Sequence, residues 1–272
     1  MLLPFIGYLR LMRIHNCLIA FFSIIMTSFI ASRSLMIRPG VLLGAMVTLF
    51  IMGGGNALND YFDDKIDRLN KPNRPIPSGL ITRKKALFFS IALFFTGVVL
   101  SFSLNLLAMS IATANACLLI IYARYSKTMV FAANALIALM TSSVFIFSGA
   151  ILNMIDLNMI VLALSAFFVM MSREILKDIE DIQGDRRSGA LTLPIKLGVK
   201  RARAVSTVFV LPAILLIFLP SILKTMDSPY LGLIMLATMV LIFSLFLQPK
   251  KSQKVIKLAT MIVLTAFLAG SF

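Results

Sequence analysis

Residues 39–67 read PGVLLGAMVTLFIMGGGNALNDYFDDKID, and in this stretch a run without any Lys, Arg, Asp or Glu leads directly into a row of acids. The charge-free part, 39–59, has the length of one membrane-spanning helix, which needs about 20 mainly apolar residues. The stretch therefore predicts a transmembrane helix that carries a cluster of carboxylates at one end.

The rest of the chain repeats the apolar part of this pattern. The run 86–123 is long enough for two helices, which a turn at 101–105 (SFSLN) would separate. Counted in this way, the charge-free runs predict nine spans: 14–32, 39–59, two within 86–123, 128–155, 157–172, 204–223, 228–249 and 258–272. We therefore expect an all-α integral membrane protein, a bundle of nine transmembrane helices in a single domain over 1–272.

Composition excludes other classes. The chain is 60% hydrophobic and 14% charged, whereas soluble domains are about 45–50% apolar and about 25% charged. A soluble enzyme and a disordered chain are therefore both excluded. Two cysteines in 272 residues are too few for a disulfide scaffold or a cysteine-based metal cluster.

The basic residues predict the orientation in the membrane. The net charge is +15, with 26 Lys and Arg against 11 Asp and Glu. If nine spans alternate sides, 23 of the 26 basic residues lie on the side of the N-terminus, and only Arg33, Arg38 and Lys224 lie on the other. Since cytoplasmic loops carry the basic excess, we expect a multi-pass protein of the cell membrane whose N-terminus is cytoplasmic. The charge then reflects topology, and we expect no nucleic-acid partner.

Nine of the eleven acids fall in two short segments, 60–67 and 174–185, both on the predicted cytoplasmic side. In the first, Asn59, Asp63 and Asp67 stand at i, i+4 and i+8, so they share one face of a helix, with Asp60 beside them. In the second, Asp178, Asp181 and Asp185 stand at i, i+3 and i+7. Like charges at these spacings repel, which favours a bound cation.

The ligand types indicate which cation. Carboxylate and amide oxygens without His or Cys suit Mg²⁺ or Ca²⁺, and Mg²⁺ typically takes one or two carboxylates and leaves other positions to water and substrate phosphate. Basic residues follow each acid row: Arg68, Lys71 and Arg74 after the first, and Arg186 and Arg187 after the second. Acids for a metal beside bases for phosphate oxygens favour diphosphate chemistry.

The pattern Asn59-Asp60-x-x-Asp63-x-x-x-Asp67, then 74–79 (RPIPSG), then Lys177-Asp178-x-x-Asp181-x-x-x-Asp185 resembles the UbiA superfamily of intramembrane prenyltransferases over nearly the whole chain. The segments 13–20 (RIHNCLIA), 53–63 (GGGNALNDYFD) and 173–181 (REILKDIED) are similar to its archaeal digeranylgeranylglyceryl phosphate synthase branch. In one departure, Asp64 stands where the family often has a basic residue, and Lys65 or Arg68 could substitute.

The resemblance implies a nine-helix bundle around a central cavity, with cytoplasmic active-site loops at about 59–85, 123–130 and 173–203. It implies a set of Mg²⁺ ligands: Asn59, Asp60, Asp63, Asp67, Asp178, Asp181 and Asp185. It implies that the catalytic residues are Asp63, Asp67, Asp181, Asp185 and Lys127. It implies that the substrates contact Arg13, Asn16, Arg68, Lys71, Arg74, Tyr122, Arg124, Lys127 and Lys177.

The implied reaction joins a geranylgeranyl group from geranylgeranyl diphosphate to the glycerol hydroxyl of geranylgeranylglyceryl phosphate, a membrane lipid. Mg²⁺ and basic side chains would neutralise the departing diphosphate, and an apolar tunnel would exclude water. Arg13 or residues of 196–203 are candidates for the acceptor's phosphate, and the general base is not identified.

Two alternatives remain open at this point. The acceptor could be an aromatic ring, as in quinone or haem pathways of the same superfamily. A secondary transporter is a more distant alternative, because transporters place ionisable residues near mid-span, whereas the acids here gather at the ends of spans.

Overall fold

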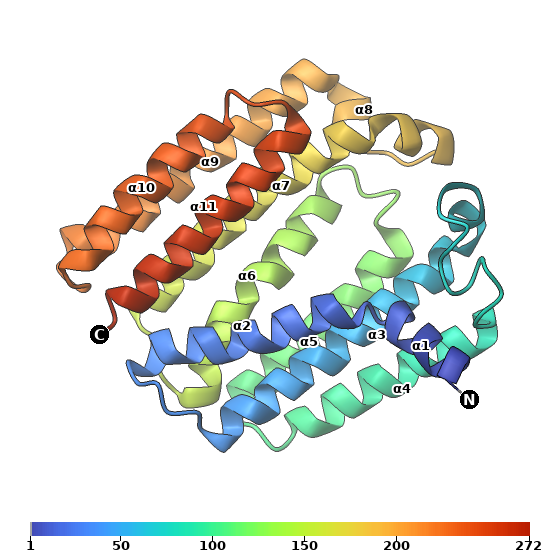
Figure 1. The fold of residues 1–272 in the computed structure, drawn as a ribbon, viewed down its shortest axis with the longest axis horizontal. Coiled ribbons are helices and arrows are strands. Elements are labelled where there is room, and N and C mark those ends of the chain that lie inside the picture. Colours follow the sequence, from blue (N-terminus) through green and yellow to red (C-terminus); the bar gives the residue numbers. More distant parts are fainter. Residues whose placement is uncertain (1) are drawn as a thin grey trace. The chain divides into compact units, whose positions relative to one another are not determined.

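The computed structural model describes the backbone of residues 2–272 and the side chains of these residues except 2–4, 69, 70 and 188. The described part consists of helices and connecting turns, without a strand (Figure 1). The helices are α1 (Leu2–Leu11), α2 (Ile14–Ser32), α3 (Pro39–Asn70), α4 (Arg83–Ser101), α5 (Leu106–Tyr125), α6 (Ala132–Leu152), α7 (Leu157–Ser188), α8 (Leu193–Leu197), α9 (Val199–Ile222), α10 (Ser228–Ser244) and α11 (Pro249–Ala269). The predicted all-α class is confirmed.

Eight of the described helices are long and apolar enough to cross a membrane, and α10 is a shorter apolar helix of 17 residues. The predicted division of 86–123 is confirmed, because α4 ends at Ser101 and the side chain of Asn105 caps the N-terminus of α5 by accepting a hydrogen bond from the backbone N–H of Ala108 at 2.9 Å. The count of nine spans stays a prediction.

Both acid rows lie on helices, as their spacing predicts, within the segments that were also expected to form active-site loops. Helices α3 and α7 contain 32 residues each, which corresponds to about 48 Å at 1.5 Å per residue, well beyond the roughly 30 Å hydrocarbon core. The segments expected as loops, 59–85 and 173–203, are thus helical as far as Asn70 and Ser188. The helices continue because no glycine in a left-handed conformation and no proline interrupts the backbone hydrogen bonds before these points.

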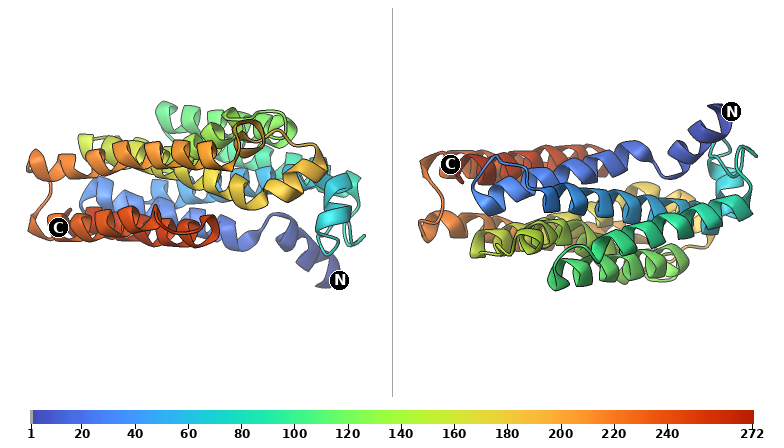
Figure 2. Two further views of the ribbon diagram at one scale, coloured as in Figure 1. Left: turned by 90° about the horizontal axis from the view of Figure 1, so that it is seen from above. Right: turned by 90° about the horizontal axis from the view of Figure 1, so that it is seen from below.

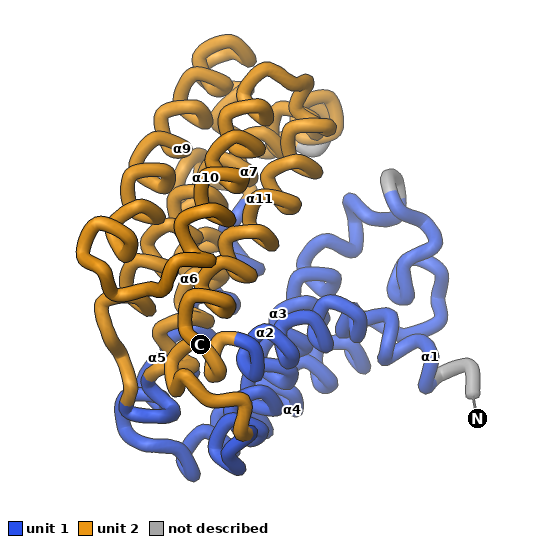
Figure 3. Tube along the Cα trace, turned by 60° about the vertical axis from the view of Figure 1, so that its left-hand side comes forward, with its two compact units in different colours: residues 1–26, 37–126, 150–153 blue, residues 27–36, 127–149, 154–272 orange. Residues whose placement is uncertain are grey.

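The chain divides into two compact units (Figure 3). Unit 1 comprises residues 1–26, 37–126 and 150–153, and so contains α1, α3, α4, α5 and most of α2. Unit 2 comprises residues 27–36, 127–149 and 154–272, and so contains α7 to α11 and most of α6. Each unit carries one of the two acid rows.

In unit 1, small residues allow α3 to pack closely against α4 and α5. A Cβ atom at Gly54 would lie 3.0 Å from the ring of Phe94 and 3.2 Å from its backbone nitrogen. At the same place, the hydroxyl of Ser90 donates a hydrogen bond to the carbonyl oxygen of Gly54 at 2.8 Å. Small residues and interhelical hydrogen bonds of this kind hold membrane helices together.

We expect Gly54→Ala to destabilise the protein by about 1–3 kcal/mol, because the added methyl group overpacks the contact with Phe94. Gly232→Ala on α10 is the control, since outside its own turns of helix no atom of the described residues lies within 4 Å of a Cβ at that position. Thermal unfolding in detergent measures both, and equal midpoints for the two variants would contradict the close packing at Gly54.

In unit 2, α7 packs against α9 and α11, and α10 packs against α11. Figure 1 shows α10 and α11 side by side, and in the views of Figure 2, from above and from below, the two helices overlap. The hydroxyl groups of Ser172 on α7 and Ser206 on α9 lie 2.9 Å apart, and Ser206 also donates to the carbonyl oxygen of Ser172. These contacts place the C-terminal part of α7, which bears the second acid row, at a fixed position in the unit.

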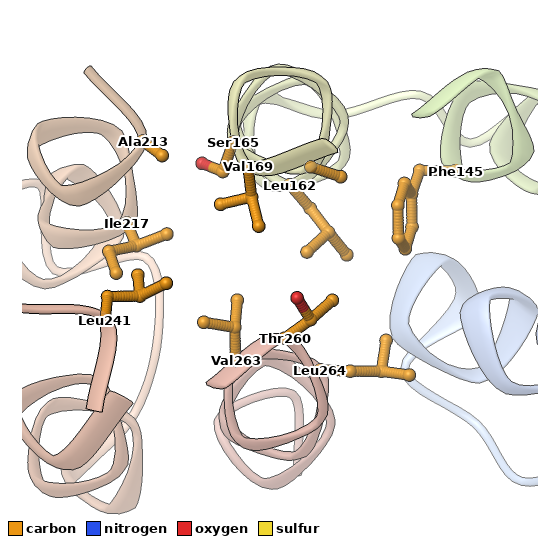
Figure 4. A pocket seen from close by; sticks show the side chains of 11 residues that line it. Phe145, Leu162, Ser165, Val169, Ala213, Ile217, Leu241, Thr260, Val263 and Leu264 are labelled. Carbon is orange, nitrogen blue, oxygen red and sulfur yellow. The ribbon is translucent and has the colours of Figure 1, made fainter. Parts of the chain in front are cut away.

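A small apolar cavity of about 50 Å³ lies among α6, α7, α9, α10 and α11 (Figure 4). Its two polar side chains, Ser165 and Thr260, each donate a hydrogen bond to a carbonyl oxygen of their own helix, at 2.7 and 2.9 Å. The cavity is therefore suited to an apolar group.

Candidate active site

The connection between α3 and α4 holds a basic side chain over the first acid row. Ile76 and Ile81 in this connection are 3% exposed and pack against Leu11 and Ala57. Between them, the chain turns at Gly79, whose φ of +77° is a conformation that favours glycine. The fixed connection directs Arg74 back onto α3.

Arg74 bridges two acids of the first row. Its Nη1 atom lies 3.0 Å from Asp60 Oδ1 and is also hydrogen-bonded to Asp67 Oδ2. Arg13 reaches the same Asp60 oxygen with its Nη2 atom, at 2.7 Å. Because Asp60 and Asp67 are only 3% and 4% exposed, these arginines supply the charge that buried carboxylates require.

Arg13 is positioned by the tight turn between α1 and α2. It adopts a left-handed backbone conformation with φ of 53°. The side-chain amide of Asn56 on α3 donates a hydrogen bond to the carbonyl oxygen of Met12 at 2.9 Å, which ties this turn to α3. The structure therefore brings Arg13 into the first acid row, 47 residues away along the chain.

The other first-row residues pair along α3 itself. The side-chain amide of Asn59 donates to Asp63 Oδ2 at 3.0 Å. Arg68 Nε lies 3.1 Å from Asp64 Oδ1, one turn away. Asp60, Asp64 and Asp67 are thus paired with arginines, whereas Asn59 and Asp63 form a separate pair of oxygen-bearing side chains.

The remaining unit 1 candidates lie around this end of α3 or at the start of α2. The guanidinium of Arg124, at the end of α5, lies 5.3 Å from the ring centroid of Phe62, a cation–π contact. Tyr122 and Asn16 are half-buried, and Lys71 is exposed.

In unit 2, the second acid row is held from neighbouring elements. Asn134 on α6 donates a hydrogen bond to Asp178 Oδ2 at 2.9 Å. Gly189 ends α7 with φ of 71°, and the N–H of Ala190 bonds to the carbonyl oxygen of Asp185. The next N–H, that of Leu191, bonds to the carbonyl oxygen of Lys127 at 2.9 Å.

This last contact places Lys127 next to the second row, although it lies far from it along the chain. Asp185 interacts electrostatically with Asp181, with Lys177 and with Lys127. Unit 2 thus brings together two carboxylates at i, i+4 spacing and two lysines, all of which were sequence candidates.

Glu180, which also belongs to the second acid-rich segment, contacts α11. Glu180 accepts a hydrogen bond from Gln253 of α11 at 2.8 Å, and Lys250 Nζ lies 3.8 Å from its other oxygen. Glu180 therefore joins α7 to α11 and is distinct from the candidate ligands Asp181 and Asp185.

Residues that the sequence analysis did not assign also gather on α7. Arg173 Nη1 donates to Glu174 Oε1 at 2.5 Å, and Lys177 Nζ lies 3.3 Å from Glu174 Oε2. Glu174 is 6% exposed. The sequence could have indicated Arg173 as a candidate functional residue, because it is the first charged residue after the charge-free run 157–172.

The donor chemistry of each unit fits Mg²⁺. Within the described residues, no three His, Cys, Asp or Glu side chains form a metal-binding group. Unit 1 nevertheless offers Asn59 and Asp63, whose side chains are hydrogen-bonded to each other, and unit 2 offers Asp181 and Asp185. One or two carboxylates are what Mg²⁺ usually takes from a protein when a substrate phosphate completes its shell.

Comparison with known proteins identifies the family. Residues 20–269 match the model of the UbiA prenyltransferase family. The chain belongs to this family. It is 40% identical to the digeranylgeranylglyceryl phosphate synthase of Methanococcus aeolicus, over 97% of each chain, and 36% identical to that of Pyrococcus horikoshii, again over 97% of each.

Solved structures agree with this assignment. A structure described as giving insight into digeranylgeranylglyceryl phosphate synthase in membranes matches with a TM-score of 0.87 and 36% identity over 98% of both chains. A UbiA homologue from Archaeoglobus fulgidus, bound to DMAPP and Mg²⁺, shares the fold with a TM-score of 0.70 at 17% identity, over 97% of this chain and 98% of that one.

Family membership makes the chain a prenyltransferase and a multi-pass membrane protein. It confirms the resemblance drawn from the acid rows and favours an enzyme over the secondary transporter. The roles of the individual side chains at the two rows remain predictions.

Proposed function

We propose that this UbiA prenyltransferase transfers the geranylgeranyl group of geranylgeranyl diphosphate to the glycerol hydroxyl of geranylgeranylglyceryl phosphate. The product is digeranylgeranylglyceryl phosphate, and diphosphate is released. The observation that carries the proposal is the presence of an acid row with adjacent cations at the end of each of the long helices α3 and α7. The near-full-length similarity to synthases of that name favours this glycerol acceptor over an aromatic one.

We further propose that nine helices enclose one cavity, with α10 as a span, and that the ends of α3 and α7 that bear the acid rows face the cytoplasm. The 23 basic residues on one side of such a bundle support this orientation. The proposed enzyme then lies in the cell membrane with its active site open to a cytoplasmic diphosphate substrate.

The residues of the two acid rows have two roles in this proposal: some bind the metal and others support the metal ligands. Asn59 and Asp63 in unit 1, and Asp181 and Asp185 in unit 2, would hold Mg²⁺. Asp178 and the arginine-paired Asp60 and Asp67 would support them. Bound Mg²⁺ supplies positive charge to the leaving diphosphate.

The cationic side chains of the chain act on the same developing charge. Lys127 and Lys177 lie within electrostatic range of Asp185, and we propose that both contact the diphosphate, together with Arg124. Preorganised cations lower the barrier selectively, because charge on the leaving group grows in the transition state. The allylic carbon–oxygen bond breaks, a new ether bond forms, and the hydroxyl proton passes to diphosphate or to an aspartate.

Removal of the divalent metal is expected to abolish turnover. Purified protein treated with EDTA should give less than about 1% of the rate with Mg²⁺, because the diphosphate would leave without its main counter-charge. Addition of excess Mg²⁺ should restore the rate, as measured by product formation from labelled geranylgeranyl diphosphate. Full activity in EDTA would contradict the metal role.

Mass spectrometry of the product tests the acceptor. With geranylgeranyl diphosphate, Mg²⁺ and equal amounts of geranylgeranylglyceryl phosphate and 4-hydroxybenzoate as an aromatic acceptor, we expect the glycerol product to dominate. A product on the aromatic ring alone would overturn the proposed acceptor and leave the prenyl transfer standing.

A further inference from the structure

A half-buried arginine on α7, Arg173, has no role in the proposal above. Arg173 lies one turn before Lys177 and two turns before Asp181, so the three share one face of the helix. Its position, directly after the charge-free run 157–172, places a cation next to the most apolar part of the helix. Ionisable residues within spans are costly and commonly mark a functional site.

The hydrogen bonds of Arg173 leave one edge of its guanidinium available. Nη1 donates to Glu174 and also lies 3.6 Å from the sulfur of Met170. Nε is buried and has no acceptor among the described residues. Nε and Nη2 form the edge of arginine that binds a carboxylate or phosphate with two parallel hydrogen bonds. A buried donor without an acceptor is destabilising, so this edge is suited to an anionic ligand.

The local charge also favours an anion. Among the described residues, Arg173 forms an ion pair with Glu174, which is shared with Lys177, so these three residues carry one net positive charge. Two of the earlier candidates for the acceptor's phosphate are engaged elsewhere: Arg13 pairs with Asp60, and Arg203 donates to the carbonyl oxygens of Leu245 and Leu247. The basic residues Lys196, Lys200 and Arg201 are exposed.

The position along α7 matches the chemistry of the acceptor. Arg173 lies eight residues, or about 12 Å along the helix axis, from Asp181 of the proposed diphosphate site. The acceptor carries its phosphate and its reacting hydroxyl on the same three-carbon glycerol. Its phosphate must therefore bind near the reacting carbon but apart from the diphosphate.

We propose that Arg173 binds the phosphomonoester of the acceptor through its Nε and Nη2 atoms, while Glu174 fixes the guanidinium in place. Arg173 thus selects a phosphorylated glycerol ether over its unphosphorylated form. This inference rests on the proposed function, and it assigns the acceptor's phosphate to α7 rather than to Arg13 or residues 196–203.

The test compares two acceptors, geranylgeranylglyceryl phosphate and geranylgeranylglycerol. We expect Arg173→Gln to raise KM for the phosphorylated acceptor by about 10- to 100-fold, the size of a lost charge-assisted contact. KM for geranylgeranyl diphosphate should not change. The preference for the phosphorylated acceptor over geranylgeranylglycerol should be lower in Arg173→Gln than in the wild type by the same factor.

Two further variants complete the design. Arg38→Gln is the matched control, because Arg38 is exposed and makes no side-chain capping bond at the start of α3. Arg173→Lys keeps the charge and a partner for Glu174 but loses the two-bond geometry. It should give an intermediate KM, and it supplies the test if Arg173→Gln does not fold.

The outcomes separate the two proposals. Equal loss of activity with both acceptors, or a raised KM for geranylgeranyl diphosphate instead, would overturn the role of Arg173 and leave the proposed function intact. A wild type that prenylates neither glycerol acceptor would overturn the proposed function, and this inference with it.

Discussion

Asp63→Asn is expected to lower kcat/KM by about a thousandfold, within the range found when one electrostatic group at a reacting centre is lost. The substitution keeps the size of the side chain but removes the negative charge next to Asn59, whose amide lies 3.0 Å from Asp63 Oδ2. A weaker divalent site would leave the departing diphosphate less neutralised. Initial rates measured across a Mg²⁺ titration should show a higher Mg²⁺ requirement together with the lower rate.

Glu180→Gln provides the matched control, since it removes one carboxylate from the other acid-rich segment. Glu180 contacts Gln253 and Lys250 of α11 rather than the candidate ligands, so its loss should change kcat/KM less than threefold, or about 0.7 kcal/mol. The assignment of Asp63 would be refuted by an Asp63→Asn enzyme that keeps a tenth of the wild-type activity, or by an equal loss in Glu180→Gln.

Arg74→Gln is expected to destabilise the protein by about 3 kcal/mol. Arg74 pairs with both Asp60 and Asp67, which are nearly fully buried, and a buried carboxylate without its partner costs about 3–5 kcal/mol. We expect the lower end of this range because Asp60 would still form its ion pair with Arg13. Unfolding followed by helical circular dichroism in detergent measures the effect.

Two variants define this prediction further. Arg68→Gln should cost less than Arg74→Gln, because the Arg68 side chain is 57% exposed and pairs with one acid, Asp64, whereas Arg74 pairs with two. Asp67→Asn in the Arg74→Gln background should recover part of the lost stability by removing the unpaired charge. Equal destabilisation by Arg74→Gln and Arg68→Gln would show that the two ion pairs of Arg74 contribute no more to stability than the single pair of Arg68.

Much of the fold could be predicted because membrane helices impose a simple rule on sequence. Charge-free runs of sufficient length gave the apolar helices, and the polar residues of 101–105 gave the turn that Asn105 caps. The C-terminal ends of the long helices α3 and α7 could not be predicted from charge-free runs. Charged residues are excluded from the hydrocarbon core but not from a helix, so the acid rows of α3 and α7 look like loops when judged by hydropathy alone.

The site was predictable only where it depends on helical spacing. The shared faces of Asp63 with Asn59 and of Asp181 with Asp185 follow from residues four apart. The arginine partners do not, because Arg13 reaches Asp60 only through the tertiary packing of the turn after α1. In the same way, Asn134 on α6 reaches Asp178 across 44 residues. The family resemblance predicted that Arg13 and Arg74 contact substrate, and the structure adds that both pair with acids of the first row.

The central proposal is that Asn59 and Asp63 would act together with Asp181 and Asp185 on one metal–diphosphate complex. A double-mutant cycle of Asp63→Asn and Asp181→Asn tests it most directly, with kcat/KM and the Mn²⁺ affinity in the presence of a non-transferable prenyl diphosphate analogue as readouts. Residues that act as one unit are strongly non-additive. The account predicts that the second substitution adds less than about tenfold to the loss caused by the first. Losses that multiply, with a coupling energy below about 0.5 kcal/mol, would contradict it.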